Sequence, residues 1–597
     1  MLDFSLPALY QVPSGGNLAD PVHRNAEEHP DVAVLSRKVD GRWQELTSVQ
    51  FLAEVHAAAK GLIAAGVEPG DRVGIMSRTR YEWTLLDFAI WTAGAITVPV
   101  YETSSAEQVE WILGDSGAVA VITETAKHVQ VLDEVRDRLP ELKHTWQIEG
   151  GVLAALAEAG RDVPDATVHE RRRIAGPDDV ATIVYTSGTT GRPKGCQLTH
   201  GNFLAECGNV VEQLAPLFRT GESSVLLFLP LAHVLGRIAE IAPAMAPIKL
   251  GHVSDIRDVT AELAAFKPSL ILGVPRVFEK VYNTARAKAQ ADGKGKIFDK
   301  AADTAIAYSR ALDAGGAGLV LRLKHAVFDK LVYSKLRAAL GGRATHAISG
   351  GAPLGERLGH FYRGIGFTVL EGYGLTETCA ATAFNPCDKP KIGTVGRPVP
   401  GCSVRIAEDG EVLLKGPHIS TGYWNNPQAT ADSLKDGWFA TGDLGSLDSE
   451  GYLTITGRKK EIIVTAGGKN VAPAVIEDRI RGHALVGEVM VVGDRKPFVA
   501  CLITVDPEFF PKWKELNGKP AGATVAELAT DPDLLAALQA AVDDGNAAVS
   551  HAEAVKKFRL LDTEFSEESG HLTPSLKLKR NVVLKDFAAD IEALYQK

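Results

Sequence analysis

The chain has 597 residues, with 45% hydrophobic and 23% charged residues, which is the composition of an ordinary globular protein. Its formal net charge of −10 argues against a nucleic-acid-binding protein that relies on bulk positive charge. No apolar run approaches the about 18 residues that a membrane span needs, and the N-terminus lacks the basic start and apolar core of a secretory signal.

Short apolar segments alternate with segments of helical spacing through the first part of the chain. Residues 81–95 predict a helix, and residues 345–374 predict strand, loop, helix, strand and loop. Further strands are predicted at 71–77, 96–101, 118–124, 181–187, 224–230 and 269–275. This alternation predicts an α/β fold with doubly wound parallel sheets and helices on both of their faces.

The pattern changes after about residue 400. Residues 403–416 predict a hairpin around Asp409 and Gly410, typical of a β subdomain, and the last 120 residues predict a small α+β domain. The charged turn at 457–461 marks the expected boundary. We therefore predict an N-terminal domain over 1–457 and a small C-terminal domain over 458–597.

The six cysteines are scattered and form no C-x-x-C pair, so they predict neither a zinc site nor a disulfide framework. A reduced, cytoplasmic environment is the expected location. The cysteines are Cys196, Cys207, Cys379, Cys387, Cys402 and Cys501.

A helical, basic segment at 276–343 contains 14 Lys or Arg and 6 Asp or Glu residues, a net charge of +8 within an acidic protein. One interpretation is a solvated helical face. The other is a surface that faces anionic lipid, where each basic group contributes about 1 kcal/mol. The second interpretation predicts a peripheral protein at the inner face of the cell membrane.

A loop rich in glycine and hydroxyl residues, YTSGTTGRPKG, spans Tyr185 to Gly195 and follows a β-branched run. Glycines let the backbone N–H groups approach an anion, hydroxyls add donors and Lys194 adds positive charge. The loop is not a Walker A motif, because Pro193 precedes the lysine and glycine follows it. It predicts a phosphate cradle, with a flexible surface loop as the alternative.

This loop resembles the phosphate-loop signature of the AMP-forming acyl-adenylate superfamily, which includes acyl-CoA synthetases, adenylation domains and luciferases. Five further motifs follow in the family's order: SGGAPL, EGYGLTET, TGDLG, GRKKEIIVTAGGKNVAP and PSLKLKRN. The resemblance implies a large N-terminal domain and a mobile C-terminal domain hinged near 458–460. It also implies two steps, in which a carboxylate attacks the α-phosphate of ATP and a thiol then displaces AMP.

The resemblance implies roles for residues around the phosphates, where positioning and charge neutralisation matter most. Thr376 would reach the α-phosphate, and Glu377 would hold Mg²⁺ together with Thr186. The departing phosphates would be cradled by Thr186, Ser187, Gly188, Thr189, Thr190, Gly191 and Lys194.

The nucleoside would be bound by two other motifs. Tyr373 would stack on the adenine, and Asp443 and Arg458 would bind the ribose hydroxyls. The rest of the adenine pocket is expected from SGGAPL and EGYG, with Gly351, Ala352, Pro353, Glu371, Gly372 and Gly374.

Lys577 matches the C-terminal catalytic lysine that would bridge the substrate carboxylate and the α-phosphate. Many family members have glycine before this lysine, whereas this chain has Leu576. Lys579 and Arg580 lie close by, and strand-like alternation would put Lys577 and Lys579 on the same face. Spacing alone therefore does not separate them, and a solvated basic tail is the alternative.

Three further residues are expected to act in the thiol step, and a fourth is expected to lie near the carboxylate of the acid substrate. Lys460 matches the hinge, and Gly467 and Gly468 would lie beside the pantetheine of CoA. His233 aligns with a histidine near the substrate carboxylate in relatives, although a buried core histidine is an equal alternative.

Two features of the sequence indicate which acid is the substrate and which thiol accepts the acyl group. No acidic residue can be assigned to a substrate amine, and the basic insert resembles that of long-chain fatty acyl-CoA synthetases. The expected function is therefore a long-chain fatty acid–CoA ligase that uses ATP, Mg²⁺ and CoA. The alternative, a fatty acyl-AMP ligase, carries an extra segment for which 441–461 and 487–505 look too compact. The sequence leaves the oligomeric state open.

Overall fold

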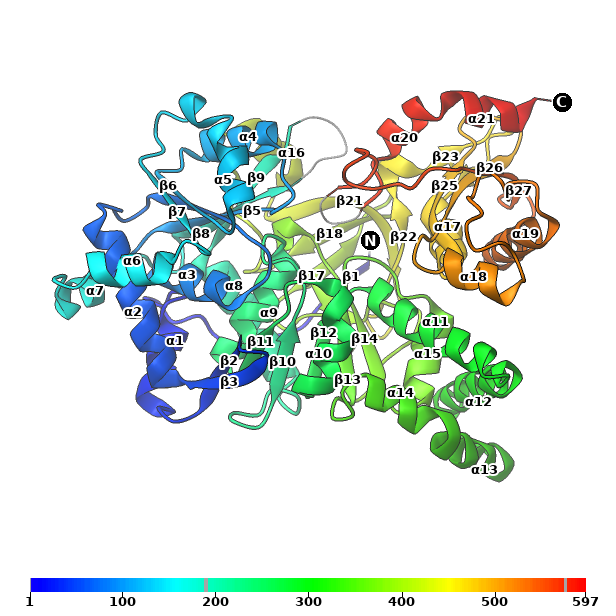
Figure 1. The fold of residues 1–597 in the computed structure, drawn as a ribbon, viewed down its shortest axis with the longest axis horizontal. Coiled ribbons are helices and arrows are strands. Elements are labelled where there is room, and N and C mark those ends of the chain that lie inside the picture. Colours follow the sequence, from blue (N-terminus) through cyan, green and yellow to red (C-terminus); the bar gives the residue numbers. More distant parts are fainter. Residues whose placement is uncertain (1, 187–191, 574–576, 597) are drawn as a thin grey trace.

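The computed structural model describes residues 2–186, 192–573 and 577–596 (Figure 1). It contains a large N-terminal α/β part and a C-terminal domain, which lies at the upper right of Figure 1. The predicted Ser187 to Gly191 and Leu576 lie outside the described residues.

The first sheet has nine strands in the order β16-β15-β14-β13-β12-β10-β11-β2-β3. The strands from β14 to β2 run parallel, whereas β15, β16 and β3 pair antiparallel at the two edges. The strands are β2 (Ala33–Val39), β3 (Arg42–Thr47), β10 (Ser224–Leu227), β11 (Lys249–His252), β12 (Leu270–Gly273), β13 (His346–Ser349), β14 (Thr368–Tyr373), β15 (Ala383–Phe384) and β16 (Arg397–Pro398).

The second sheet has seven strands in the order β19-β9-β8-β5-β4-β6-β7, with a parallel core and antiparallel β9 and β19. Its strands are β4 (Arg72–Met76), β5 (Ile96–Val100), β6 (Ala120–Thr123), β7 (His144–Gln147), β8 (Val180–Thr186), β9 (Lys194–Thr199) and β19 (Gly422–Tyr423). All the strands predicted between 71 and 275 are confirmed within these two sheets.

Both faces of the second sheet are buried, as a doubly wound fold requires. Successive side chains of a strand point to opposite faces. Ile122 of β6 packs in the core that contains Phe88 of α3 (Tyr81–Thr92), whereas Val121 packs on the other face with Val109 of α4 (Ala106–Ser116). The predicted fold class is confirmed.

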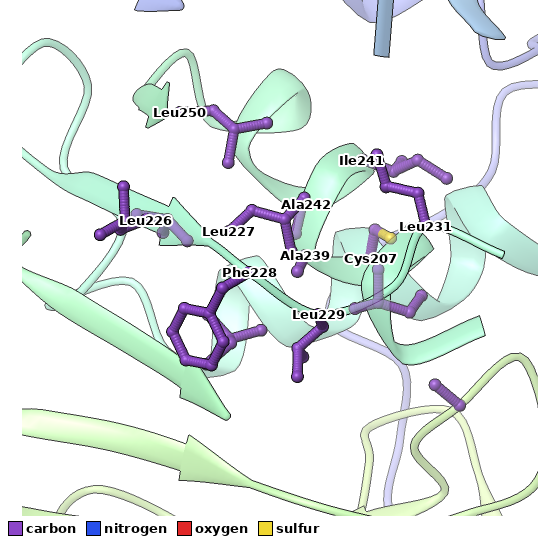
Figure 2. Packing of buried hydrophobic residues seen from close by; sticks show 14 of the residues in the cluster. Cys207, Leu226, Leu227, Phe228, Leu229, Leu231, Ala239, Ile241, Ala242 and Leu250 are labelled. Carbon is purple, nitrogen blue, oxygen red and sulfur yellow. The ribbon is translucent and has the colours of Figure 1, made fainter. Parts of the chain in front are cut away.

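Helices cover the sheets and place loops at the carboxyl ends of the parallel strands. They include α1 (Asp20–Glu28), α2 (Ser48–Ala64), α5 (Ala126–Asp133), α6 (Val152–Ala159), α7 (Asp165–Arg171), α8 (His200–Gln213), α9 (Val234–Met245), α10 (Val259–Phe266), α15 (Glu356–Gly364) and α16 (Pro427–Ser433). Figure 2 shows Leu227 of β10 beside Ala239 and Ala242 of α9, all three in the same buried cluster. This packing fixes the position of α9 against the nine-stranded sheet.

The basic segment is helical, as predicted. It forms α11 (Pro275–Ala291), α12 (Gly295–Asp313), α13 (Leu319–Phe328), a π-helical segment (Asp329–Tyr333) and α14 (Ser334–Ala339). These helices lie at the lower right of Figure 1, with α13 at the periphery. Among the described residues, no helix is long and apolar enough to cross a bilayer.

A third sheet is antiparallel and forms the β subdomain. It contains β1 (Leu2–Ser5), β17 (Ser403–Ile406), β18 (Glu411–Lys415), β20 (Leu434–Lys435), β21 (Trp438–Leu447) and β22 (Leu453–Arg458). β17 and β18 form the predicted hairpin, in which Gly410 adopts φ +85°. This left-handed conformation suits glycine because it has no Cβ.

The C-terminal domain has its own core. A three-stranded sheet of β25 (Val486–Val492), β26 (Val499–Val505) and β27 (Val555–Leu560) is preceded by the small ladder β23 (Ile463–Val464) and β24 (Asn470–Val471). The helices are α17 (Pro473–Arg481), α18 (Phe510–Leu516), α19 (Pro532–Asn546), α20 (Arg580–Asp586) and α21 (Ala588–Tyr595). Among the described residues, its two core clusters begin at Ile463 and share no member with those of the N-terminal part.

Candidate functional site

A cleft with a volume of about 3430 Å³ lies between the N-terminal part and the C-terminal domain. A pocket for one drug-sized ligand has a volume of about 300–1,000 Å³, so this cleft has room for several ligand groups. The predicted site residues that line it are Thr186, Lys194, His233, Gly351, Ala352, Pro353, Gly372, Tyr373, Gly374, Thr376, Glu377, Asp443, Arg458, Lys460 and Lys577.

Glu377 lies in a single 3₁₀ turn, Thr376–Thr378, directly after β14. Its Oε1 accepts a hydrogen bond of 2.7 Å from the phenol of Tyr423. The Nζ of Lys194 lies 5.2 Å from the centre of the same phenol ring, within the range of a cation–π contact. Tyr423 therefore holds the predicted acid and the predicted lysine beside each other.

Tyr423 is a residue that the sequence analysis missed. It lies in β19, which pairs with β9 so that Tyr423 is opposite Cys196, two residues after Lys194. Burial and the nearby Glu377 raise the pKa of Tyr423, so the phenol stays protonated and can donate a hydrogen bond. Only the pairing of β19 with β9 reveals this role, because more than 200 residues separate the two strands.

The carboxylate of Glu377 fits a hard divalent cation. Its Oε2 makes no hydrogen bond to any residue that the structure describes, whereas Oε1 is held by Tyr423. Thr186, at the end of β8, adds a hydroxyl whose hydrogen bond to the Lys194 carbonyl is long, at 3.4 Å. Mg²⁺ prefers a few oxygen ligands of this kind together with water and substrate phosphates.

Tyr373, Asp443 and Arg458 form a connected group that also lines the cleft. The phenol of Tyr373 donates to Asp443 Oδ2 at 2.6 Å, and Arg458 Nε forms an ion pair with Oδ1 at 3.0 Å. The antiparallel pairing of β21 with β22 places Asp443 directly opposite Arg458. Asp443 is thus buried, and its two donors fix the orientation of the carboxylate. Such a fixed orientation suits a residue that binds a polar ligand.

The loop after β13 is held by Glu371. The backbone N–H of Leu354 donates to Glu371 Oε2 at 3.0 Å, and Gly351 adopts φ +85° within this loop. Burial raises the pKa of Glu371 to about 7. The contact gives Glu371 a supporting position behind the loop, with Leu354 rather than a ligand as its partner.

Gly374 is required by a close backbone approach. A Cβ atom at this position would lie 1.5 Å from the carbonyl oxygen of Ala380, which no side chain tolerates. The strand β14 can therefore deliver the turn with Thr376 and Glu377 into the cleft only with glycine here.

Lys577 lies next to an antiparallel bridge between Leu572 and Leu578, and its backbone N–H donates to Thr573 Oγ1 at 3.0 Å. Its side chain is exposed to solvent inside the cleft, where the walls of both domains surround it. Burial within the cleft and the charge of Arg458 lower the pKa of Lys577, whereas Asp443 and Glu377 oppose this shift. Lys577 is thus electrostatically coupled to residues of the N-terminal part.

The two neighbouring cations are arranged differently. The backbone N–H of Lys579 donates to the carbonyl of His571 at 2.8 Å, and the guanidinium of Arg580 binds Glu477 at 2.6 Å within the C-terminal domain. Lys579 also lines the cleft, and the charges of Asp443 and Glu377 act on the ammonium group of Lys577. The choice of Lys577 over Lys579, which sequence spacing left equivalent, stays a prediction.

His233 caps the N-terminus of α9. Its Nδ1 accepts a hydrogen bond from the Leu235 N–H at 3.1 Å, so the neutral ring carries its proton on Nε2. Burial and the positive charge of Lys577 lower the pKa of His233 to about 4. The side chain is therefore neutral near pH 7 and offers an N–H donor at the wall of the cleft.

Of the residues predicted for the thiol step, one lines the cleft and two do not. Lys460 lies in the 3₁₀ turn Lys459–Glu461 and lines the cleft. Gly467 and Gly468 lie in the turn between β23 and β24 and do not line it, so the structure does not bring them to the site in this domain arrangement.

Charged and polar pairs connect the two domains across the cleft. Lys280 of α11 forms an ion pair of 2.6 Å with Glu508, and Arg276 contacts Asp506. The Thr103 hydroxyl donates to Glu567 Oε1 at 2.7 Å. Together these contacts favour the orientation in which Lys577 lies in the cleft.

Comparisons with known proteins agree with this arrangement. The sequence profile of the AMP-binding enzyme family matches residues 22–424, and that of the AMP-binding enzyme C-terminal domain matches residues 460–597. The chain is 54% identical over 600 residues to the long-chain-fatty-acid–CoA ligase FadD15 of Mycobacterium tuberculosis, with 100% of both chains covered. It is 30% identical to the long-chain-fatty-acid–CoA ligase ACSBG2 of Xenopus laevis, over 95% of this chain and 82% of the relative.

Two solved structures share the fold. A fatty acyl CoA synthetase of Mycobacterium tuberculosis aligns with a TM-score of 0.61 and 24% identity, over 96% of this chain and 99% of the other. The anthranilate CoA ligase AuaEII, solved with anthranoyl-AMP, aligns with a TM-score of 0.71 and 20% identity, over 97% and 99%. On the strength of the two matching profiles and the full-length relatives, the chain belongs to the AMP-binding enzyme family.

Proposed function

We propose that the protein is an AMP-forming long-chain fatty acid–CoA ligase, which converts a fatty acid, ATP and CoA into fatty acyl-CoA, AMP and pyrophosphate. One observation carries the proposal: the chain is 54% identical to the long-chain-fatty-acid–CoA ligase FadD15 over the whole length of both proteins. The lining of the cleft supports the proposal, because it includes residues that could bind ATP and a carboxylate.

In the first step, the fatty acid carboxylate attacks the α-phosphate of ATP, forming an acyl-adenylate while the bond to pyrophosphate breaks. Negative charge develops on the phosphate oxygens, and Lys577 would stabilise it. Lys194 and the Thr186 hydroxyl would bind the departing phosphates, and Thr376 would bind the α-phosphate. A Mg²⁺ ion on Glu377 would neutralise phosphate charge when bound.

The nucleoside would bind beside Asp443. Asp443, oriented by Tyr373 and Arg458, can accept hydrogen bonds from both ribose hydroxyls, and the loop from Gly351 to Pro353 would lie along the adenine. Because Asp443 is already held by two donors, binding would require little reordering of its side chain.

In the second step, the CoA thiol sulfur attacks the acyl carbon, the thiol proton is lost, and AMP leaves with the bond electrons. We propose that the C-terminal domain (458–597) then turns about Lys460 relative to the N-terminal domain (1–457). This rotation would replace Lys577 at the cleft by the turn with Gly467 and Gly468. A Cβ added at Gly467 would have only the Thr465 hydroxyl within 4 Å, and one added at Gly468 would have nothing, so the turn has free space for a pantetheine chain.

A long apolar acid fits the interior of the cleft. Its lining includes the apolar side chains of Val210, Phe218, Phe228, Ile238, Leu263 and Leu272. Burial of each CH₂ group of an acyl chain contributes about 0.8 kcal/mol, so such a lining favours long chains over short ones. His233 would donate its Nε2–H near the substrate carboxylate.

CoA is favoured over a carrier protein as the acceptor. In a fatty acyl-AMP ligase an extra segment would restrain the C-terminal domain. Here β25 (Val486–Val492) and β26 (Val499–Val505) are joined by six residues, which leaves no room for one in this connection.

We also propose that the helices of 276–343 face an anionic membrane surface at the inner side of the cell membrane. Eight of the basic side chains are exposed and form no ion pair with a described residue. They are Lys288, Lys294, Lys296, Lys300, Arg322, Lys324, Lys330 and Lys335. Each can contribute about 1 kcal/mol near an anionic surface.

The test is pyrophosphate release with fatty acids from acetate to about C20, with and without CoA, on the chain-length argument above. The proposal predicts release that rises with chain length and continues over many turnovers only when CoA is present. A single burst that CoA cannot extend would instead support the fatty acyl-AMP ligase.

A further inference from the structure

Helix α13 carries a stripe of exposed apolar side chains. Leu319, Leu323, Val327 and Leu331 recur every four residues and are 72%, 61%, 56% and 54% exposed, with Val320 beside them at 68%. Residues four apart lie on the same face of a helix, and the following π-helical segment carries Leu331. Large apolar side chains grouped in this way on a surface mark a site of interaction.

The stripe cannot turn inward, because the other face of α13 is already packed. The ring of His325 stacks on Tyr308 of α12 at 3.9 Å between centroids, and its Nε2 lies 2.6 Å from the carbonyl oxygen of Gly364. These contacts fix the rotation of α13 about its axis. The apolar stripe therefore faces away from the protein as a permanent feature of the fold.

Positive charge surrounds the stripe. Arg322, Lys324, Lys330 and Lys335 are exposed and form no ion pair with any residue described by the structure. Asp329 is the only acidic residue between 319 and 339, and it is paired with Arg337 at 2.7 Å. The net result is an apolar face with uncompensated cations along its sides.

We propose that α13 lies in the headgroup region of an anionic bilayer, with Leu319, Leu323 and Val327 inserted among the acyl chains. This inference rests on the proposed function and makes its membrane contact specific: insertion of one helix rather than charge attraction over the whole insert. An apolar face with basic residues at its sides is the pattern of helices that lie in this interface.

A second copy of the chain fits the stripe less well than lipid does. In a two-fold symmetric pair, the same patch contacts itself, so Arg322 and Lys324 would approach their own copies. Like charges at close range oppose such a contact, whereas anionic headgroups complement them.

The position of α13 connects the bilayer to the cleft. α13 packs on α12, whose Ala302 and Ile306 line the cleft, as do Val277 and Val281 of α11. A protein anchored by α13 would hold the apolar side of its cleft near the membrane surface. A fatty acid could then pass from the bilayer to the cleft over a short path.

The test is sedimentation of the full-length protein with phosphatidylcholine vesicles that contain or lack phosphatidylglycerol, over a range of salt concentrations. Leu323→Glu/Val327→Glu places two carboxylates in the stripe without touching the packed face. We expect this variant to lose about tenfold or more of its affinity for anionic vesicles at every salt concentration. Ile174→Glu and Val49→Glu, at exposed apolar positions outside the insert, are matched controls that should bind like the wild type.

Arg322→Gln/Lys324→Gln separates charge from insertion. This variant should bind more weakly at low salt on vesicles with phosphatidylglycerol, and its remaining binding should persist at high salt. Equal vesicle binding by the stripe variant and the wild type would overturn the proposal. Loss of a dimer in the stripe variant, detected by analytical ultracentrifugation, without vesicle binding by the wild type would also overturn it and assign the stripe to a second copy.

Activity with detergent-dispersed fatty acid distinguishes this proposal from the ligase itself. The wild type and the stripe variant should have the same rate there, because α13 contributes no residue to the reacting groups. A wild type that binds vesicles but forms no acyl-CoA would reject the proposed function and leave the membrane contact in place.

Discussion

The phenol of Tyr423 donates a 2.7 Å hydrogen bond to Glu377, and its ring lies 5.2 Å from the Nζ of Lys194. One tyrosine thus contacts the residue expected to hold Mg²⁺ and the lysine expected to bind the departing phosphates. Because the phenol keeps its proton, it orients Glu377 Oε1 and leaves Oε2 for a cation. We therefore propose that Tyr423 is a positioning residue for the metal–ATP complex.

Tyr423→Phe removes this hydrogen bond and keeps the ring beneath Lys194. A hydrogen bond to a charged group contributes about 1.5–3 kcal/mol, so we expect the KM for Mg²⁺–ATP to rise roughly tenfold or more. Steady-state kinetics at varied magnesium should show part of this loss recovered at high Mg²⁺. Tyr595→Phe, which removes a hydrogen bond to Val492 in the C-terminal domain, is the control. An unchanged KM and magnesium dependence in Tyr423→Phe would reject the role.

Glu371 makes stability depend on pH. The pKa of Glu371 is about 7 in the folded protein, against 4.5 when unperturbed. Between pH 4.5 and pH 7 the folded state therefore binds more protons at this site than the unfolded state does. Stability contributed at this site is therefore present below about pH 4.5 and is lost as pH rises to about 7. Glu371→Gln keeps an oxygen for the Leu354 N–H and removes this titration.

The stability difference between Glu371→Gln and the wild type should grow in favour of the variant from pH 5 to pH 8. The shift corresponds to a value on the order of 3 kcal/mol at the upper end. Chemical denaturation at several pH values measures it. Parallel pH profiles for the two proteins would show that Glu371 is not the group that titrates.

Lys460→Pro should separate the two half-reactions. Proline fixes φ near −65° and restricts the preceding residue, which would hinder rotation at the hinge. We expect adenylation, measured as pyrophosphate release in a single turnover, to keep its rate. Transfer of the acyl group from the acyl-adenylate to CoA should become slower. Lys460→Ala, which keeps the backbone free, should retain both steps. Normal overall turnover in Lys460→Pro would remove the hinge assignment.

The ion pair between Lys280 and Glu508 should favour the domain orientation seen here. Both side chains are substantially exposed, so the pair contributes at most about 1 kcal/mol, or roughly fivefold in an equilibrium. Lys280→Glu should slow adenylation by up to that factor at low salt, and the double variant Lys280→Glu/Glu508→Lys should restore it. If the double variant is as slow as the single one, the pair does not act through charge.

Much of the fold could be predicted from sequence because buried parallel strands are short, continuous apolar runs between helices. The strand predicted at 118–124, for example, is β6 (Ala120–Thr123), buried on both faces. The hairpin at Asp409 and Gly410 followed from a turn that needs a left-handed residue. Such local requirements leave a direct trace in the sequence.

The site was less predictable wherever contacts join distant segments. Lys577 and Lys579 share spacing, and only the packing of the C-terminal domain against the cleft places Lys577 near Glu377 and Asp443. Tyr423 contacts Glu377 through the pairing of β19 with β9, which no local pattern reports. The position of Gly467 and Gly468 outside the cleft depends on the domain orientation, to which contacts such as that between Lys280 and Glu508 contribute.

Lys577→Ala, assayed separately in the two half-reactions, tests the account most directly, with Lys579→Ala as the matched control. If Lys577 stabilises the charge that develops during adenylation, the variant loses pyrophosphate release yet still converts supplied acyl-adenylate and CoA to acyl-CoA. Lys579→Ala should retain both steps. Equal loss of both half-reactions in Lys577→Ala, or loss of adenylation in Lys579→Ala instead, would contradict the assignment.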